Sequence, residues 1–194
     1  CLTTRKAIEE SIDWDCQVEK IYSEENLGCA RRIRSGLDSV FKKETRAIIL
    51  EDDTLPNSSF FKFCEFCLNR YDNDQSVYHI SGCNFYPNSS EAISSYYLTS
   101  IVNIWGWATW RRAWNKYDVE MKSWLKYNSY FKMKSLGYRG VVMKLRSLRT
   151  LSLTYKKKIN TWDYQWDFCC RKKKGLSIIP QVNLISNLGL GGGT

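Results

Sequence analysis

A short apolar segment that ends abruptly in three acidic residues constrains this chain more than any other feature. Residues 47–50 (AIIL) include no polar side chain. The next three positions are Glu51, Asp52 and Asp53. An uninterrupted apolar run of this length is typical of a strand buried on both faces in a parallel sheet. Because open α/β sheets bind ligands beyond the carboxyl ends of their strands, the segment predicts a central strand that ends at a carboxylate site.

Apolar spacing along the rest of the chain predicts alternating strands and helices. We expect strands over residues 16–22, 47–50, 76–81, 96–102 and 176–179, and helices over 30–41, 60–71, 111–117, 128–149 and 162–174. Asn57 or Ser58 is expected to cap the second of these helices and Thr161 the last. The alternation predicts an α/β sandwich with a mainly parallel central sheet flanked by helices. The 194 residues fit a single domain, and no apolar run reaches the roughly 20 residues of a membrane-spanning helix.

Charge is distributed unevenly between the two halves of the chain. Residues 1–97 carry 11 Lys and Arg against 16 Asp and Glu, whereas residues 98–194 carry 18 against 4. A basic half attracts phosphate groups, whether on nucleic acid, on anionic lipid or on a phosphorylated substrate. Solvated lysines on helix faces explain the same count, so charge alone does not select a partner.

The cysteines form no recognisable zinc or disulfide framework. Cys64 and Cys67 lie one helical turn apart in an apolar segment, and the sequence has no second pair of this kind. Most of the eight cysteines lie in or beside apolar runs, which favours buried free thiols and a reducing, cytoplasmic setting. The single histidine, His79, lies in a strand-like run, which disfavours catalysis by a Ser–His or Cys–His pair.

The three adjacent carboxylates have two explanations. Like charges repel one another, and a divalent cation would compensate them. Hard oxygen ligands suit Mg²⁺ or Mn²⁺, and such an ion would hold a substrate diphosphate. An acidic turn before the helix that starts near Asn57 explains the same residues, and the residues alone leave both explanations open.

Four motifs in a fixed order resemble nucleotide-sugar glycosyltransferases of the GT-A fold. They are NLG (26–28) with AIILEDD (47–53), SGCNF (81–85), IWGWATWRRAW (104–114) and TWDYQW (161–166). Their order is similar to that in bacterial sugar transferases of the nucleotide-diphospho-sugar transferase superfamily, and more distantly to that in N-acetylglucosaminyltransferase I. The resemblance spans about residues 26–190. It implies a Rossmann-like GT-A sandwich, truncated at the N-terminus so that the first strand–helix unit is missing.

The resemblance implies a role for each acidic residue of the motifs. Asp53 is expected to bind the metal, Asp52 the ribose or the metal's water shell, and Glu51 the donor sugar or a group that positions it. Asp163 matches the catalytic base that takes the acceptor hydroxyl proton in an inverting transfer. The dipole at a helix start favours its ionised form, although an acid at that position is also common without any catalytic role. Asp167, one turn later, is the alternative base.

Aromatic and amide side chains complete the expected site. Trp105 and Trp107 are candidates for stacking on an acceptor sugar, and Gly106 would allow close backbone approach to it. Aromatic residues at this density also fit a buried core. Asn84, at the end of a predicted strand, is the candidate polar contact to the donor.

Together, the resemblance and the charge pattern imply a metal-dependent, inverting glycosyltransferase that uses Mn²⁺ or Mg²⁺ in bacterial surface-polysaccharide synthesis. The expected partners are a nucleotide-sugar donor, a glycan or lipid-linked acceptor and an anionic membrane surface at the cytoplasmic side, with no nucleic acid. Two rivals stay open. A sugar-phosphate nucleotidyltransferase usually carries a Gly-rich basic loop near its first strand, and none is visible here. A non-enzymatic basic module that binds nucleic acid would lose affinity steeply with salt, and no recognised motif supports it.

Overall fold

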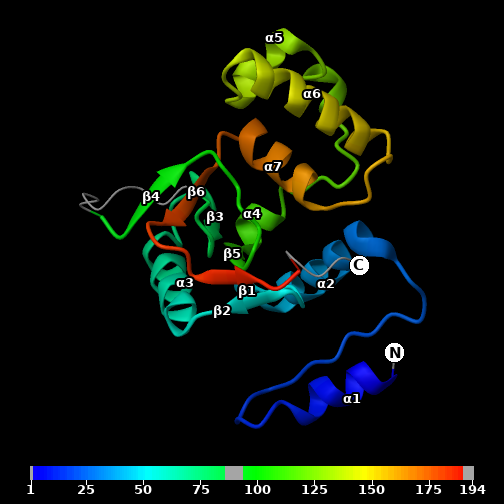
Figure 1. Ribbon diagram of the computed structural model, residues 1–194, viewed down its shortest axis with the longest axis vertical. Helices are drawn as coiled ribbons and strands as arrows, with labels where there is room; N and C mark the ends of the chain where they lie inside the picture. The colour runs from blue at the N-terminus through cyan, green and yellow to red at the C-terminus, as the bar shows by residue number, and fades with distance from the viewer. Residues whose placement is uncertain (1, 86–93, 190–194) are drawn as a thin grey trace.

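A five-stranded sheet lies at the centre of the protein, between helices (Figure 1). The computed structural model describes residues 2–85 and 94–189. The strands of this sheet, in spatial order, are β1 (Arg46–Ile49), β5 (Trp107–Trp110), β3 (Val77–Ser81), β6 (Leu176–Pro180) and β4 (Tyr96–Thr99). The mixed α/β architecture predicted from the sequence is therefore confirmed.

The prediction of a mainly parallel sheet is wrong. Only β3 and β6 pair in parallel, whereas β1 with β5, β5 with β3 and β6 with β4 are antiparallel within the described residues. Two of these antiparallel pairs involve β5, whose residues were expected to be an aromatic run leading into a helix, and the third involves β4, whose direction the sequence does not indicate. Strand β5 lies between β1 and β3 and runs against both, so that Trp107 is opposite Ile49 on one side and Ser81 on the other.

Helices cover both faces of the sheet. The helices of the described residues are α1 (Leu2–Glu10), α2 (Gly28–Lys43), α3 (Ser58–Arg70), α4 (Arg111–Trp114), α5 (Tyr130–Met133), α6 (Val141–Tyr155) and α7 (Asp163–Lys172), with 3₁₀ turns η1 (Trp124–Lys126) and η2 (Lys134–Leu136). Of these, α2, α3 and α7 pack on the sheet, whereas α1 lies away from it. Ala108 and Trp110 of β5 pack in the cluster that includes α3. Trp107, on the opposite face of the same strand, packs in the cluster that includes α2 and α7. Every residue of β5 is therefore buried, as expected of a strand covered on both sides.

Local signals at the helix starts were correct for α3 and wrong for α7. The Asn57 side chain accepts hydrogen bonds from the backbone N–H groups of Ser59 and Phe60, at 3.0 and 3.2 Å, and so caps α3. The residue before α7 is Trp162, whose side chain makes no capping bond. The expected cap, Thr161, instead donates its hydroxyl to the Asp163 carboxylate.

The predicted strand over residues 16–22 is also wrong. This segment has no strand partner in the described part of the chain and runs beside α1, away from the central sheet (Figure 1). Glu9 of α1 holds it through an ion pair with Lys20 at 2.9 Å and a hydrogen bond from the Tyr22 hydroxyl at 3.0 Å. A β-prone sequence forms a strand only where a neighbour supplies backbone partners.

A second, two-stranded sheet brings residues 185–187 beside the acidic motif. β2 (Thr54–Pro56) pairs antiparallel with β7 (Ile185–Asn187), with Thr54 opposite Asn187. The sequence analysis predicted neither strand. Across residues 2–85 and 94–189, no helix combines the length and apolar character needed to cross a membrane.

A substitution at Gly106, just before β5, is expected to destabilise the fold. Its φ of +57° favours glycine, and a Cβ there would lie 2.4 Å from Cδ1 of Ile185. Gly106→Ala should therefore lower the free energy of unfolding by about 2–4 kcal/mol in a urea titration. Gly36→Ala is the matched control, since nothing lies within 4 Å of that added methyl in α2. The stability of this control should increase by up to about 1 kcal/mol, because alanine has a higher helix propensity than glycine. Equal stability of the two variants would contradict the steric and conformational need for glycine at position 106.

Candidate functional site

The acidic motif occupies a turn between β1 and β2 whose backbone is fixed by Thr54. The Glu51 backbone N–H donates to the Thr54 hydroxyl at 3.0 Å, and this hydroxyl donates to the Glu51 carbonyl at 2.7 Å. The pairing of β2 with β7 holds the far side of the turn. The three carboxylates therefore project from a constrained turn at the carboxyl end of β1, as the sequence predicted. The prediction of a central strand buried on both faces is wrong, because β1 lies at the edge of the described sheet and is only partly buried.

Asp53 is partly buried, and hydrogen bonds hold both its side chain and its backbone. One carboxylate oxygen, Oδ2, accepts a hydrogen bond from the Asn187 side chain at 3.1 Å, and the Asp53 carbonyl accepts from the Leu188 N–H at 2.8 Å. The other oxygen, Oδ1, is buried and has no hydrogen-bond partner in the part of the chain that the structure describes. A buried carboxylate oxygen without a partner is costly, so this atom is a candidate ligand for a cation.

Glu51 connects the acidic turn to the start of α7. The indole N–H of Trp162 donates to Glu51 Oε1 at 3.1 Å, although the two residues are 111 positions apart. Burial is the main cause that raises the pKa of Glu51, and the negative charges of Asp53, Asp163 and Asp52 raise it further against the effect of the Trp162 bond. We call the acid Glu51 and the three acids whose charges act on it the carboxylate cluster (Glu51, Asp52, Asp53 and Asp163).

The first turn of α2 borders the same cluster. Burial raises the pKa of the Cys29 thiol, and the charges of Glu51 and Asp163 add to this effect. A Cβ on Gly28, which has a φ of +69°, would lie 2.7 Å from Nδ2 of Asn160. Glycine at position 28 thus lets the start of α2 pack closely against the segment that leads into α7.

The residues fit a divalent cation that a substrate helps to bind. No group of three or more His, Cys, Asp or Glu side chains within residues 2–85 and 94–189 is arranged to hold an ion by itself. Mg²⁺ is commonly bound by one or two carboxylates together with substrate phosphates. The unpartnered oxygen of Asp53 and the mutual repulsion around Glu51 suit that mode of binding.

The two candidate bases on α7 have different environments. Asp167 pairs with Arg171 at 2.8 Å through both carboxylate oxygens and accepts the Tyr138 hydroxyl at 2.6 Å. Its hydrogen-bonding capacity is therefore used within the fold. Asp163 is only partly buried and belongs to the carboxylate cluster. The geometry favours Asp163 as the residue that can meet a substrate.

The tryptophan segment lies largely in the core. Trp107 is fully buried, and its ring stacks between His79 at 5.2 Å and Trp162 at 5.1 Å. These rings cover both faces of Trp107 and leave none for an acceptor sugar. The Gly106 carbonyl accepts the Gly82 N–H at 2.7 Å. Trp105 is only partly buried, with its ring at an edge contact of 4.7 Å to Phe85.

Asn84 connects the end of β3 to the turn after β6. Its side-chain N–H groups donate to the carbonyls of Pro180 and Gln181 at 2.9 and 3.2 Å. The Asn84 backbone N–H donates to the Asn183 side chain at 3.1 Å. These bonds give Asn84 a clear structural function, and its contact with a donor stays a prediction.

Most cysteines and the single histidine are structural, as expected. Five cysteines have buried, free thiols: Cys64, Cys67, Cys83, Cys169 and Cys170. Cys16 and Cys29 are exposed, so the prediction of buried thiols is wrong for these two. The indole N–H of Trp166 donates to His79 Nδ1 at 3.2 Å, so the ring proton is on Nε2, which donates to the Asn103 carbonyl at 2.8 Å. Burial lowers the pKa of His79 to about 4, which keeps it neutral.

Between the start of α2 and the segment that leads into α7 lies a cavity of about 370 Å³ that the sequence did not predict. Arg31, Lys157, Asn160 and Thr161 line it, together with Gln165 from the first two turns of α7. The Gln165 side chain donates to the Thr161 carbonyl at 2.6 Å, while its buried oxygen has no hydrogen-bond partner in the described residues. The only signal in the sequence was the position of Gln165 two residues after Asp163, which is too weak to identify a pocket.

Comparison with known proteins gives no assignment: no protein-family model matches the chain, and no curated protein matches it. The arguments for a function therefore come from the motifs and from the geometry of the carboxylate cluster.

The raised pKa of Glu51 predicts a pH-dependent effect of Glu51→Gln. A folded-state pKa above the ordinary 4.5 means that the folded protein binds this proton more tightly than the unfolded chain does. The carboxyl then contributes most to stability below pH 4.5 and loses that contribution as the pH rises through the raised pKa. The glutamine side chain of the Glu51→Gln variant does not ionise, so this variant does not lose stability as the pH rises. Its Tm should exceed that of the wild type at pH 7 and approach it at pH 4.

Glu65→Gln, an exposed acid on α3, is the matched control for this measurement. Its Tm difference from the wild type should be small and the same at both pH values. A lower Tm of Glu51→Gln than of wild type at pH 7 would contradict the repulsion inferred within the cluster.

Proposed function

We propose that this chain is a metal-dependent, inverting glycosyltransferase of the GT-A type. The proposed reaction transfers a sugar from a nucleotide-diphosphate donor to a glycan or lipid-linked acceptor in bacterial surface-polysaccharide synthesis, at the cytoplasmic side of the membrane. The observation that carries the proposal is the 3.1 Å hydrogen bond from Trp162 to Glu51. It joins the two motifs that the family resemblance marks as donor site and catalytic base, which are 111 residues apart in the chain.

Each carboxylate has a separate task in this mechanism. Asp53, with its unpartnered oxygen, would hold Mn²⁺ or Mg²⁺. When bound, the cation supplies electrostatic stabilisation of the charge on the departing nucleoside diphosphate. Asp52 is exposed and can reach the ribose or water around the ion, while Glu51, fixed by Trp162, faces the donor sugar.

Asp163 would perform the proton transfer. The acceptor oxygen attacks the anomeric carbon of the donor sugar, the bond between that carbon and the diphosphate oxygen breaks, and the acceptor proton passes to the Asp163 carboxylate. Thr161, which donates its hydroxyl to Asp163, lines the cavity with Asn160 and Gln165, and this cavity would give room to a polar acceptor. The partly buried carboxylate cluster keeps the base close to the donor without burying it completely.

Nucleotide binding is the first consequence that can be measured. We expect one of UDP, GDP, CDP and dTDP to raise the Tm in the presence of Mn²⁺ and not in its absence. At a ligand concentration of 100 times Kd, the stabilisation would be about 2.7 kcal/mol. Asp53→Asn should abolish the shift, whereas Asp72→Asn, an exposed acid after α3, should retain it. An equal shift in both variants would exclude Asp53 as the metal ligand.

Asp163→Asn should separate catalysis from donor binding. Removing a general base lowers kcat by roughly 10²–10⁴-fold, while the metal-dependent Tm shift of the nucleotide should persist. Asp167→Asn is the matched comparison, because it alters the pairing with Arg171 and Tyr138. It should lower stability by on the order of 1–3 kcal/mol and leave the turnover of the folded enzyme close to that of wild type. A larger loss of kcat in Asp167→Asn would reverse the assignment of the base.

A further inference from the structure

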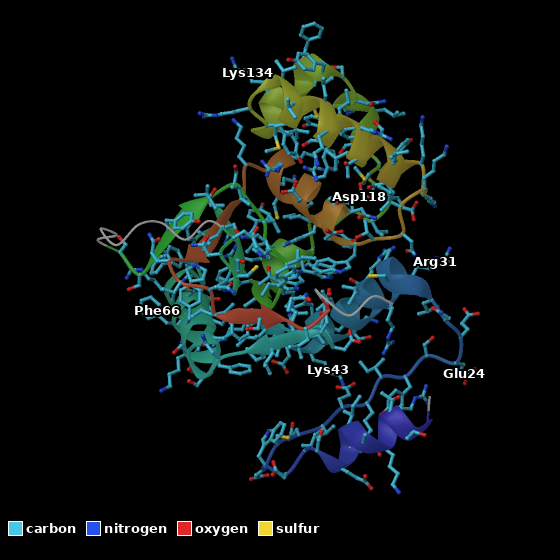
Figure 2. All side chains as sticks on the ribbon, in the orientation of Figure 1. Glu24, Arg31, Lys43, Phe66, Asp118 and Lys134 are labelled. Atoms are coloured by element: carbon cyan, nitrogen blue, oxygen red, sulfur yellow. The ribbon has the colours of Figure 1, made fainter. Side chains whose placement is uncertain are left out.

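Every charged side chain in the segment from Met121 to Asn160 is basic. Its 40 residues include 11 Lys and Arg and no Asp or Glu. The segment contains η1, α5, η2 and α6, and we call it the basic layer. In Figure 1, α5 and α6 lie at one end of the molecule, beyond α7 and far from α1, and Figure 2 shows Lys134 at this end.

The inner side of the basic layer has a complete core of its own. Trp124, Met133, Leu136 and Leu151 pack there around Phe168 of α7, and all five are at most 2% exposed. The apolar residues on the outside of the layer are therefore not needed to attach it to the rest of the protein.

The outer side exposes large apolar side chains to an unusual extent. Phe131 is 86% exposed, Val142 79% and Leu125 67%, and Val141, Met143 and Leu145 are each more than half exposed. Of these, Val142 and Leu145 lie together in one groove. Exposed apolar groups that lie together, rather than singly, mark a surface that contacts a partner or a membrane.

The outer face of α6 combines apolar and basic side chains. Val142, Leu145, Arg146, Arg149 and Leu153 line one groove of about 570 Å³ along this helix. Their spacing of three, four, seven and eleven residues places them on the same side of an α-helix. We call this set the outer face of α6.

We propose that the basic layer docks on a bilayer that contains anionic lipid, with the outer face of α6 and Phe131 at the membrane interface. An amphipathic element with basic side chains beside Leu, Val and Phe lies in the plane of the interface, where the apolar groups leave water and the cations meet lipid phosphates. A nucleic acid would match the 11 cations and could stack a base on Phe131, but would offer no apolar environment to Val142 and Leu145. This inference does not depend on the proposed transferase activity.

Flotation of the full chain with lipid vesicles tests the proposal. We expect binding to vesicles of phosphatidylcholine in which about one lipid in three is the anionic phosphatidylglycerol. We expect little binding to vesicles of phosphatidylcholine alone. Arg146→Gln with Arg149→Gln should weaken binding about 30-fold, since each basic residue near an anionic surface contributes a factor of about five. Val142→Ser with Leu145→Ser should also weaken it, at unchanged net charge.

Matched controls come from α2 and α3, which lie outside the basic layer (Figure 1). Phe66→Ser on α3 removes an apolar side chain that is 52% exposed, and Lys42→Gln with Lys62→Gln removes two exposed cations. Both should bind the anionic vesicles as the wild type does. All substituted side chains are exposed, and an unchanged Tm shows that each variant is folded.

Three outcomes would overturn the proposal. These are equal binding to neutral and anionic vesicles, wild-type binding by both α6 double variants, and losses in the controls as large as those in the α6 variants. Binding of a short DNA duplex that is unaffected by Val142→Ser with Leu145→Ser, together with no binding to vesicles, would assign the layer to nucleic acid instead.

Discussion

The indole of Trp162 joins the core of the protein to its carboxylate cluster. One face of the ring stacks on Trp107 of β5 at 5.1 Å, and the indole N–H donates to Glu51 beyond the end of β1. Trp107 in turn stacks on His79, whose own ring nitrogens are satisfied by Asn103 and Trp166. The start of α7 is therefore fixed against two strands at once. Because Asp163 follows Trp162 directly, its position depends on this aromatic stack more than on any contact of its own.

The sequence predicted elements whose stability is local and missed those that depend on distant partners. The apolar run that became β1, the periodic helix α2 and the Asn57 cap of α3 are all confirmed. β5 was missed because a strand buried on both faces shows no alternation, and its aromatic residues gave no other sign of its direction. That omission hid two antiparallel pairs, and the direction of β4, which was predicted as a strand, accounts for the third. The β-prone segment 16–22 failed for the opposite reason, since no neighbouring strand exists to pair with it in the described residues.

The candidate site shows the same limit. Residue types identified the acidic motif, and the family resemblance pointed to Asp163, but nothing in the spacing of 111 residues shows that Glu51 meets Trp162. Trp107 was a candidate for stacking on a sugar because tryptophan serves both cores and sugar sites, and only burial distinguishes the two uses. Asp163 and Asp167 could not be separated by sequence either. Their difference comes from Arg171 and Tyr138, which both bind the Asp167 carboxylate, whereas Asp163 accepts a hydrogen bond from Thr161.

α7 is the element through which chemistry and attachment would be coordinated. Its Trp166 and Cys170 pack toward the central sheet, its Phe168 packs into the basic layer, and its first residue is Asp163. A helix of ten residues that is packed on both sides holds these three features in fixed relative positions. If the outer face of α6 rests on a bilayer, the orientation of the carboxylate cluster to the membrane surface is set by the same packing. A lipid-linked acceptor would then approach Asp163 from a defined direction, and the specificity of transfer would depend partly on where the protein sits on the membrane.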